Sequence, residues 1–595
     1  MTAPPRLGAL PERTGTRFRV WAPAADHLDL VLEPRAGSGD IVTQAFDAVG
    51  DGYFEGFVAG IGTGQRYRFR LDGGDPLPDP ASRYQPEGVH GPSEIVDPEA
   101  FDWSDGEWPG IPRPDLVFYE LHIGTFTPEG TFRAAMEKLD DLRDLGITVV
   151  QLMPVADFPG RWNWGYDGAA LYAPSHSYGS PDDLRAFVNR AHSLGLAVFL
   201  DVVYNHLGPD GAYLAAYGPV FTDKHNTPWG DAINLDDEGS AGVRHFILDN
   251  ALHWLREYHL DGLRLDATHA LVDDSEPHLL AELSAAVDAL PGPPRTLVAE
   301  DHRNLNTLLL PRPEGYGLDA VWADDLHHLV RNIVAGDTEG YYADFADATT
   351  ADIAETLHRG WFYDGRPSKT TGEPRGTSAE PIRPDQCVVC IQNHDQVGNR
   401  PMGDRLTETT DLASYRAASA LLLFAPELPL LFMGQEWAAA TPFQFFTDHN
   451  DDLGPLVSAG RKDEFKDFPG FEGEVPDPQD PATFEASKLD WAERDEPDHA
   501  HTLALYQALL ALRPRLDAFT AAEPHDERGL HVQRGDHHLV VAFAPGLELP
   551  LPANATVLLH TEDARFAADP HPPEGTNGAV RFERPGALIV RTPPA

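Results

Sequence analysis

Short apolar runs recur along the chain, and the segments between them change in character twice. From about residue 17 to residue 97, apolar and polar positions alternate in runs such as 28–32 and 67–71, and Asp-Gly turns separate these runs. A period of two is typical of strands in a β-sandwich. The same texture returns beyond about residue 516, for example at 539–543. We therefore predict an N-terminal β-sandwich over residues 1–110 and a small C-terminal β-sandwich over residues 516–595.

Between these two regions, the pattern predicts parallel βα units. Continuous apolar runs alternate with longer helical stretches such as 131–145, 181–194 and 242–259. Strand candidates lie at residues 117–122, 148–154, 197–201, 262–266, 296–300, 318–322, 387–392 and 428–432. Eight strands in such units are the number that closes a β/α barrel. The predicted fold class is therefore α/β, with a parallel eight-stranded TIM-type barrel over residues 111–515 between the two β domains.

Two polar segments inside the predicted barrel do not follow this alternation. Residues 366–385 are rich in Pro, Gly and Thr, and residues 448–495 are rich in Asp, Glu and Pro. We interpret both as long loops, which in a compact domain are either functional or mobile. The two cysteines, Cys387 and Cys390, lie three apart on a predicted strand. They therefore point to opposite faces, and we expect two buried free thiols rather than a disulfide or a metal pair.

The charge balance narrows the classes of partner. The 595 residues include 94 acidic and 45 basic side chains, which gives a formal net charge of -49. Such a surface disfavours nucleic acid and anionic membranes, whereas a neutral sugar is compatible with it. No apolar run is long enough to span a membrane, and no apolar segment follows a basic start. We therefore expect neither a membrane span nor a secretory signal, and a cytoplasmic location.

Chemistry-bearing residues gather where the predicted barrel strands end. The third strand ends in Asp201, the fourth in Asp266, the fifth in Glu300, and the seventh runs on into His394 and Asp395. The carboxyl ends of barrel strands meet on one rim, where active sites lie. Each residue alone could be a structural ion pair or a cap. Four strands that agree favour an active site.

The residue types fit cleavage of a glycosidic bond, which needs two carboxyl groups in different protonation states. Arg264 lies two residues before Asp266 on one strand face, and its guanidinium favours an ionised carboxylate. Glu300 follows an apolar run, and neighbouring carboxylates would raise its pKa. We interpret Asp266 as the nucleophile and Glu300 as the proton donor. This assignment predicts retention of configuration, with the two carboxyl groups about 5–5.5 Å apart.

Four segments, 201–206, 261–269, 297–301 and 392–395, resemble the four signature regions of the α-amylase superfamily of glycoside hydrolases. The resemblance implies that Asp266 is the nucleophile, that Glu300 is the acid/base, and that Asp395 holds sugar hydroxyls and stabilises the transition state. It further implies roles for other residues at this rim: His206 and His394 as hydrogen-bond partners of the sugar, Arg264 as the active-site arginine, Asp201 as a structural acid, and Tyr166 as an aromatic under the sugar ring.

Further rim residues are candidates for contacts to neighbouring sugar units. For each of them, ordinary packing or a solvated surface position is an equal alternative. They are His269, Trp162, Trp164, Trp229, Trp437 and Phe446 among the rings, and Asp167, Asp324, His327 and Asp448 among the polar residues. No metal cluster is indicated, and we expect no cofactor, because two carboxyl groups supply the chemistry.

Four further segments make the resemblance more specific within the superfamily. Residues 164–168, 226–231, 392–400 and 445–449 resemble the trehalose-releasing hydrolases. This likeness implies hydrolysis of the α-1,4 bond next to the terminal trehalose of maltooligosyl trehalose. An α-1,6-acting branching or debranching enzyme is the closest alternative, and a non-catalytic glycan-binding barrel protein is an alternative of another class. The sequence does not indicate the oligomeric state.

Overall fold

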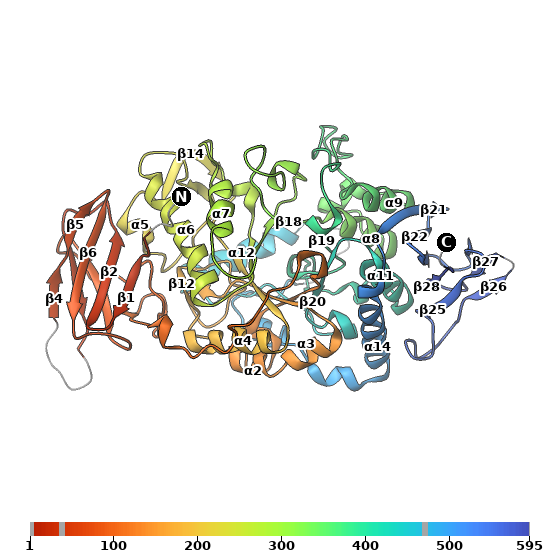
Figure 1. Cartoon of the computed structure of the whole chain (residues 1–595), viewed down its shortest axis with the longest axis horizontal. Coiled ribbons are helices and arrows are strands. Elements are labelled where there is room, and N and C mark those ends of the chain that lie inside the picture. The colour runs from red at the N-terminus through yellow and green to blue at the C-terminus, as the bar shows by residue number, and fades with distance from the viewer. Residues whose placement is uncertain (1–4, 35–41, 467–473, 577, 594–595) are drawn as a thin grey trace.

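A computed structural model describes residues 5–34, 42–466, 474–576 and 578–593. Three regions follow one another along the long axis of the molecule, with strands at both ends and a barrel between them (Figure 1). This arrangement confirms the predicted fold class. The boundaries at residues 110 and 515 stay predictions.

The N-terminal region is a sandwich of two antiparallel sheets. One sheet holds β1 (Gly8–Glu12), β2 (Gly15–Trp21), β6 (Tyr53–Ala59) and β5 (Asp47–Gly50); the other holds β4 (Val42–Ala45), β3 (Leu28–Leu32), β7 (Arg66–Leu71) and β8 (Ser93–Glu94). Alternate residues such as Phe18, Leu30 and Phe69 are fully buried between the sheets. The alternation of apolar and polar residues in the sequence therefore arises because one face of each sheet is buried against the other sheet.

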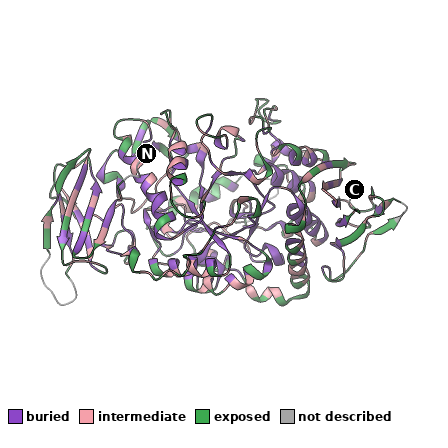
Figure 2. Ribbon diagram, in the orientation of Figure 1, coloured by how far each residue is buried: buried purple, intermediate pink, exposed green. Residues whose placement is uncertain are grey.

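Eight parallel strands close the central barrel, as the sequence predicted. In chain order they are β9 (Phe118–Leu121), β10 (Val149–Leu152), β13 (Ala197–Val202), β16 (Gly262–Leu265), β17 (Thr296–Glu300), β18 (Ala320–Trp322), β19 (Cys387–Cys390) and β20 (Leu428–Phe432). The last strand pairs with the first. Nearly all of their residues are buried, as the colouring of the centre of Figure 2 shows. Both faces are covered, which explains why these strands appear as continuous apolar runs.

Helices surround the barrel. The main ones are α2 (Phe132–Met136), α3 (Leu139–Leu145), α4 (Pro181–Ser193), α6 (Ser240–Glu257), α7 (Leu279–Asp288), α8 (Asp325–Ala335), α9 (Thr350–Arg359), α11 (Leu412–Phe424) and α14 (Pro497–Leu512). The single helix predicted over 131–145 is two helices. The amides of Glu137 and Lys138 bond to carbonyls three residues back, which tightens the chain and ends α2.

The two irregular segments behave differently. Residues 366–385 form a loop that includes a single bridge between Pro367 and Pro374, as predicted. Residues 448–495 are not one long loop, because they contain α12 (Gly454–Phe465) and α13 (Pro481–Ala486). Both helices have a proline in the first turn, a position that suits proline although proline within a segment otherwise favours a loop. Residues 467–473, which belong to this predicted loop, lie outside the described residues.

The two cysteines are buried and free, as predicted. Cys390 packs with Phe118 and Val388 inside the barrel, whereas Cys387 packs on the outer side with the helical layer. Their opposite faces rule out a bond between them. In the C-terminal region, one sheet holds β21 (Phe519–His525), β22 (Gly529–Arg534), β23 (His537–Ala542), β28 (Gly586–Arg591) and β25 (Thr556–His560), and another holds β24 (Glu548–Pro550), β27 (Ala579–Arg581) and β26 (Glu574–Thr576).

A buried ion pair joins the N-terminal sandwich to the barrel. Arg83 donates from Nη2 to Glu257, at the end of α6, over 2.9 Å, and both side chains are almost fully buried. On the same helix, a Cβ at Gly242 would lie 2.0 Å from the ring of Trp21. Only glycine therefore allows this close approach of the sandwich to α6.

Replacing Arg83 by Ala is expected to lower the free energy of unfolding by about 3–5 kcal/mol, because it leaves the buried Glu257 carboxylate short of its main partner. Urea unfolding followed by tryptophan fluorescence measures the change. The matched control is Arg17→Ala, which removes an exposed pair with Glu12 and should change stability by about 0–1 kcal/mol. Equal effects of the two substitutions would contradict a stabilising junction.

Candidate active site

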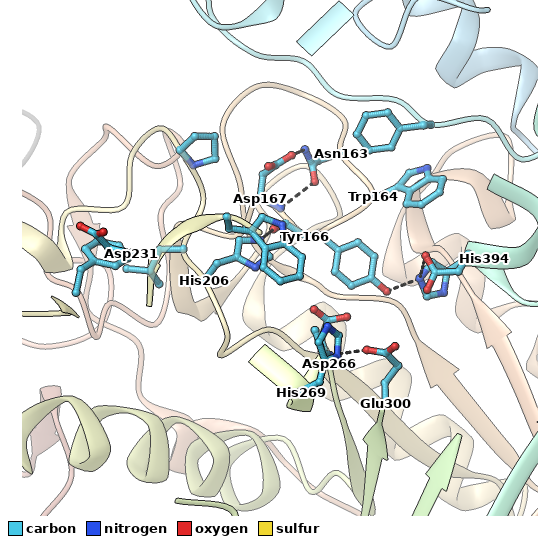
Figure 3. A pocket seen from close by; sticks show the side chains of 17 residues that line it. Asn163, Trp164, Tyr166, Asp167, His206, Asp231, Asp266, His269, Glu300 and His394 are labelled. Atoms are coloured by element: carbon cyan, nitrogen blue, oxygen red, sulfur yellow. Dashed lines mark hydrogen bonds and ion pairs between the residues drawn. The ribbon is translucent and has the colours of Figure 1, made fainter. Parts of the chain in front are cut away.

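The carboxyl ends of the barrel strands surround a cavity of about 580 Å³. Figure 3 shows Asp266, Glu300 and Tyr166 directed into it from different segments of the chain. The lining residues are Asn163, Trp164, Tyr166, Asp167, His206, Leu207, Pro209, Phe221, Trp229, Asp231, Asp266, Ala267, His269, Glu300, His394, Asp395 and Phe445. The three predicted carboxylates therefore converge on one cavity.

Asp266 follows directly on β16 and is held by two neighbours. Nη1 of Arg264 donates to Asp266 Oδ1 over 2.6 Å and to Asp201 Oδ2 over 2.7 Å. Nδ2 of Asn205 donates to Asp266 Oδ2 over 2.8 Å. Donors on both oxygens fix the orientation of this carboxyl group toward the cavity.

Glu300 ends β17, next to Asp266 across the sheet. The amide of Ala267 donates to Glu300 Oε2 over 2.6 Å, and Ala267 adopts a left-handed φ of 42° that aims this amide. Burial is the largest cause that raises the pKa of Glu300, to about 8; Arg264 opposes the rise, and Asp266 and Asp395 add to it. The predicted influence of neighbouring carboxylates is present, but removal from water matters more. Glu300 therefore carries a proton at neutral pH.

A hydrogen-bonded chain crosses the floor of the site. The hydroxyl of Tyr166 lies 2.8 Å from Asp201 Oδ2 and 2.7 Å from His394 Nε2. Glu120 accepts from the backbone amide of His394 over 2.9 Å and from its Nδ1 over 2.7 Å. Burial lowers the pKa of His394, but Asp395 and Glu120 outweigh burial and raise it to about 9. His394 is therefore a charged donor at neutral pH, placed beside Asp395.

The other predicted residues divide into two groups. His206, Trp229, His269 and Asp167 line the cavity. The ring of His206 stacks on Trp229 with centroids 5.0 Å apart, and its Nε2 lies 2.8 Å from the carbonyl oxygen of Tyr166. Arg264 and Asp201 are not among the lining residues; they are buried and act on the cavity through Asp266 and Tyr166. Burial raises the pKa of Asp201 to about 7, against the effect of Arg264.

Most of the further sugar-contact candidates lie elsewhere. Trp164 lines the cavity, but Trp162, Trp437, Phe446, Asp324, His327 and Asp448 do not. Trp437 and Phe446 are fully buried, and Trp162 stacks on Phe484. These rings fill space between elements that are distant in sequence. For these rings the packing alternative holds, and the sequence alone does not distinguish packing from stacking on a sugar.

Sequence reasoning missed several residues of the site. Glu120 lies near the end of β9 and follows the same strand-end rule that identified Asp266, so it could have been found. Asn205 stands beside His206 in the chain and had no distinguishing signal. Phe221, Asp231 and Phe445 reach the cavity from loops and the β14 (Phe221–Thr227) and β15 (Gly230–Ile233) hairpin, which only the folded chain brings there.

Replacing Glu120 by Gln is expected to lower kcat/KM about 10–100-fold. Glu120 uses one oxygen for each nitrogen of His394, and Gln replaces one of them with an NH2 group that faces an N–H donor and displaces the ring. Steady-state rates on an α-glucan substrate measure the loss. The matched control is Glu436→Gln at a second buried glutamate near the rim. Burial raises the pKa of Glu436 to about 7, so the neutral amide should be nearly silent there. Equal losses would assign Glu120 a merely structural role.

Two family models match the chain. The N-terminal carbohydrate-binding module 48, described as the isoamylase N-terminal domain, covers residues 6–98, and the alpha amylase catalytic domain covers residues 95–223. The latter match includes Asp201 and His206. The sandwich and the barrel thus each have a family assignment.

Relatives and solved structures extend this likeness over most of the chain. Malto-oligosyltrehalose trehalohydrolase of Deinococcus radiodurans is 51% identical over 85% of this chain and 83% of its own length. The enzyme of that name from Rhizobium sp. is 45% identical over 94% and 96%. A solved structure from Salmonella typhimurium, described as an alpha amylase, is 38% identical with a TM-score of 0.89 and covers 98% of this chain and 99% of that one. A pullulanase of Paenibacillus barengoltzii, 22% identical with a TM-score of 0.71 over 99% of this chain and 94% of its own, shares the fold. With its barrel, an N-terminal sandwich that matches the carbohydrate-binding module 48 model, and this identity, the chain belongs to the malto-oligosyltrehalose trehalohydrolase family of the α-amylase-type glycoside hydrolases.

Proposed function

We propose that this chain hydrolyses the α-1,4 glucosidic bond next to the terminal trehalose of maltooligosyl trehalose and releases trehalose. The observation that carries the chemistry is the convergence of Asp266, Glu300 and Asp395 on one cavity. The choice of substrate rests on relatives at 41–51% identity that bear the name malto-oligosyltrehalose trehalohydrolase.

The first step is attack by the Asp266 carboxylate on the anomeric carbon of the glucose unit that precedes trehalose. The bond to the trehalose oxygen breaks while Glu300 delivers its proton to that oxygen, so trehalose leaves as a neutral molecule. The raised pKa of Glu300, about 8, supplies this proton at neutral pH. The result is a glycosyl ester on Asp266.

The second step consumes water. Glu300, now ionised, takes a proton from a water molecule that attacks the same anomeric carbon and frees Asp266. Two inversions give net retention of configuration. Arg264 holds Asp266 throughout, because it stays charged and contacts the carboxylate over 2.6 Å.

The neighbours of these carboxyl groups hold the sugar. The side chain of Asp395 is 40% exposed, and the charged His394 lies 3.5 Å from its Oδ1. Oδ1 also accepts from Nδ2 of Asn399 over 3.2 Å, and Oδ2 is available to sugar hydroxyls. Tyr166 offers its ring beside them, and its hydroxyl is fixed by Asp201. These contacts strengthen as positive charge develops at the anomeric carbon, which is where they lower the barrier.

Aromatic and polar residues farther along the cavity are placed for the adjoining sugar units. Trp229 is half exposed and supported from beneath by His206. Aromatic faces of this kind stack on the apolar face of a sugar ring. His269 and Asp167 add hydroxyl contacts. Burial alone would raise the pKa of Asp167, but hydrogen bonds from His449 and Asn163 outweigh burial and lower it, so Asp167 is an acceptor.

The partner is thus an α-glucan rather than nucleic acid, in line with the strongly acidic surface. Among the described residues, no helix has both the length and the apolar character to cross a membrane. We further propose a cytoplasmic location. Cell fractionation with an antibody tests that location.

One experiment separates the proposed activity from its alternatives. The chain is offered maltooligosyl trehalose, plain maltooligosaccharide and an α-1,6-branched glucan, and free trehalose and new reducing ends are measured. We expect trehalose from the first substrate and slow or no cleavage of the branched one. Cleavage of the branched glucan without trehalose release would establish an α-1,6-acting enzyme, and no cleavage at all would favour a glycan-binding protein. The inactive control is Asp266→Asn.

A further inference from the structure

Three metal-ligating side chains share one face of the C-terminal sheet. Glu523 and His525 lie two apart on β21, so both point to the same side. His531 on β22 is paired directly with Glu523 in the antiparallel register. One ligand atom from each of the three lies within 4.8 Å of the others. The turn between the strands, not proximity in the sequence, creates this group.

Hydrogen bonds leave ring nitrogens of this group with unused lone pairs. Nε2 of His538 lies 3.4 Å from the Thr592 hydroxyl, which itself donates to the carbonyl of Asp536. His538 must therefore donate from Nε2 and accept at Nδ1, where Nε2 of His531 lies 3.0 Å away. His531 thus carries its proton on Nε2, and its Nδ1 keeps a lone pair. Nε2 of His525 is buried and has no hydrogen-bond partner among the described residues.

The charge around the group also suits a metal ion. Glu523 is exposed and supplies negative charge. Within the described part of the chain, no Lys or Arg is paired with Glu523.

The absence of a competing cation distinguishes this group from two others. At His225, Asp236 and Asp274, the ammonium of Lys224 lies 2.8 Å and 3.3 Å from the two carboxylates. At Asp517, Asp536 and His537, Asp536 is held by Arg591 over 2.9 Å. A metal ion would have to displace a side chain that already neutralises each of those groups.

We infer that Glu523, His525 and His531 bind a zinc(II) ion that links β21 to β22. Two imidazoles and one carboxylate form a ligand set that suits zinc, whereas Ca²⁺ and Mg²⁺ prefer oxygen ligands alone. Zinc bonds of about 2.0–2.2 Å place tetrahedral ligand atoms about 3.4 Å apart. Glu523 is exposed and can rotate to close that distance, and water fills the fourth position. His538 orients His531 behind the metal.

Zinc at this site would cross-link the two strands at the edge of the C-terminal sheet. β21 is one of the strands that attach the sheet to the barrel helices: Nε2 of His358 on α9 lies 3.1 Å from the amide nitrogen of Ala522 and 3.2 Å from its carbonyl oxygen. An ion that ties β21 to β22 therefore stabilises the attachment of the sheet to the barrel. Zinc should raise the melting temperature without changing kcat.

The test uses the full chain after treatment with a chelator. Zinc is titrated against a chromophoric zinc indicator, and the melting temperature is followed with and without the metal. We expect one saturable site per chain and a higher melting temperature with zinc. His525→Gln and His531→Gln should abolish both. His538→Phe, which keeps the ligands but removes the orienting acceptor, should weaken zinc binding about 10–100-fold.

Controls keep the result specific to this face. His225→Gln and His571→Gln alter histidines outside the group and should leave the zinc site unchanged. If a variant at position 525 unfolds, Glu523→Gln on the exposed rim provides an independent loss of one ligand. An X-ray anomalous difference peak between β21 and β22 would support the site. Zinc binding that the ligand variants leave unaltered, or that never saturates, would overturn the inference.

Discussion

Replacing Asp266 by Ala is expected to lower kcat on maltooligosyl trehalose about 10⁴–10⁶-fold, because the enzyme loses the group that forms the covalent intermediate. Substrate should still bind, since Asp395, His394 and Tyr166 remain in the cavity. The measurements are trehalose release and an independent binding titration. A decrease of only a few-fold would remove Asp266 from the proposed role.

A chemical rescue separates the loss of a nucleophile from a damaged fold. Azide fits the space that the missing carboxylate leaves and can attack the anomeric carbon from the same side. Trehalose then departs with the proton of Glu300, and the product is a glycosyl azide of inverted configuration. The matched control is Asp231→Ala, at an exposed carboxylate of the same cavity. It should cost at most about tenfold in rate, which corresponds to about 1.4 kcal/mol, and azide should not affect it.

The barrel and the main carboxylates could be predicted because each rests on a local property. A strand covered on both faces must be apolar throughout, so runs such as Thr296–Glu300 stand out from their surroundings. A charge at the end of such a run has few structural explanations. Asp266 and Glu300 were therefore visible before any contact between them was known.

The remainder of the site depends on contacts between distant segments. Trp229 and Trp437 look alike in the sequence, yet Trp229 is half exposed in the cavity while Trp437 is fully buried beside Trp491. Trp437 is covered by a ring 54 positions later in the chain, and Trp229 is supported by His206, 23 positions earlier. Glu120 is a mixed case: its place near the end of β9 follows the strand-end rule, but its pairing with His394, 274 positions later, does not show in the sequence. Local pattern gives no access to such pairings.

The helices in residues 448–495 were missed for a different reason. Their composition is acidic and rich in proline, and propensity alone favours a loop. Tertiary contacts outweigh that preference: Arg461 of α12 is buried and donates from Nη2 to the carbonyl of Gly398 over 2.7 Å. Gly398 belongs to the segment that follows the seventh barrel strand. The helix thus forms because it packs beside the site.

We expect activity to be lost as the pH rises through about 8, because Glu300 then loses the proton that it must donate. The carboxyl group must be protonated to donate to the leaving oxygen, and burial raises its pKa to about 8. Above that pH the group is ionised and the first step fails, so kcat/KM should fall on the alkaline side with an apparent pKa near 8. In Glu300→Gln, kcat should be about 10²–10⁴-fold lower, and the alkaline limb should disappear. The pH profile of kcat/KM from pH 5 to about pH 10 measures both.

Two comparisons identify the group responsible for that limb. His394 has a raised pKa of about 9 and could also titrate on the alkaline side. Glu120→Gln removes one cause of that rise, so it should move any limb that belongs to His394 and leave the Glu300 limb near 8 in place. An activated aryl α-glucoside, whose leaving group needs no proton, should lose much less in the first turnover of Glu300→Gln than maltooligosyl trehalose does. A shift of the apparent pKa of the alkaline limb in Glu120→Gln would contradict the assignment of Glu300 as proton donor. Equal losses of activity on both substrates in Glu300→Gln would contradict it as well.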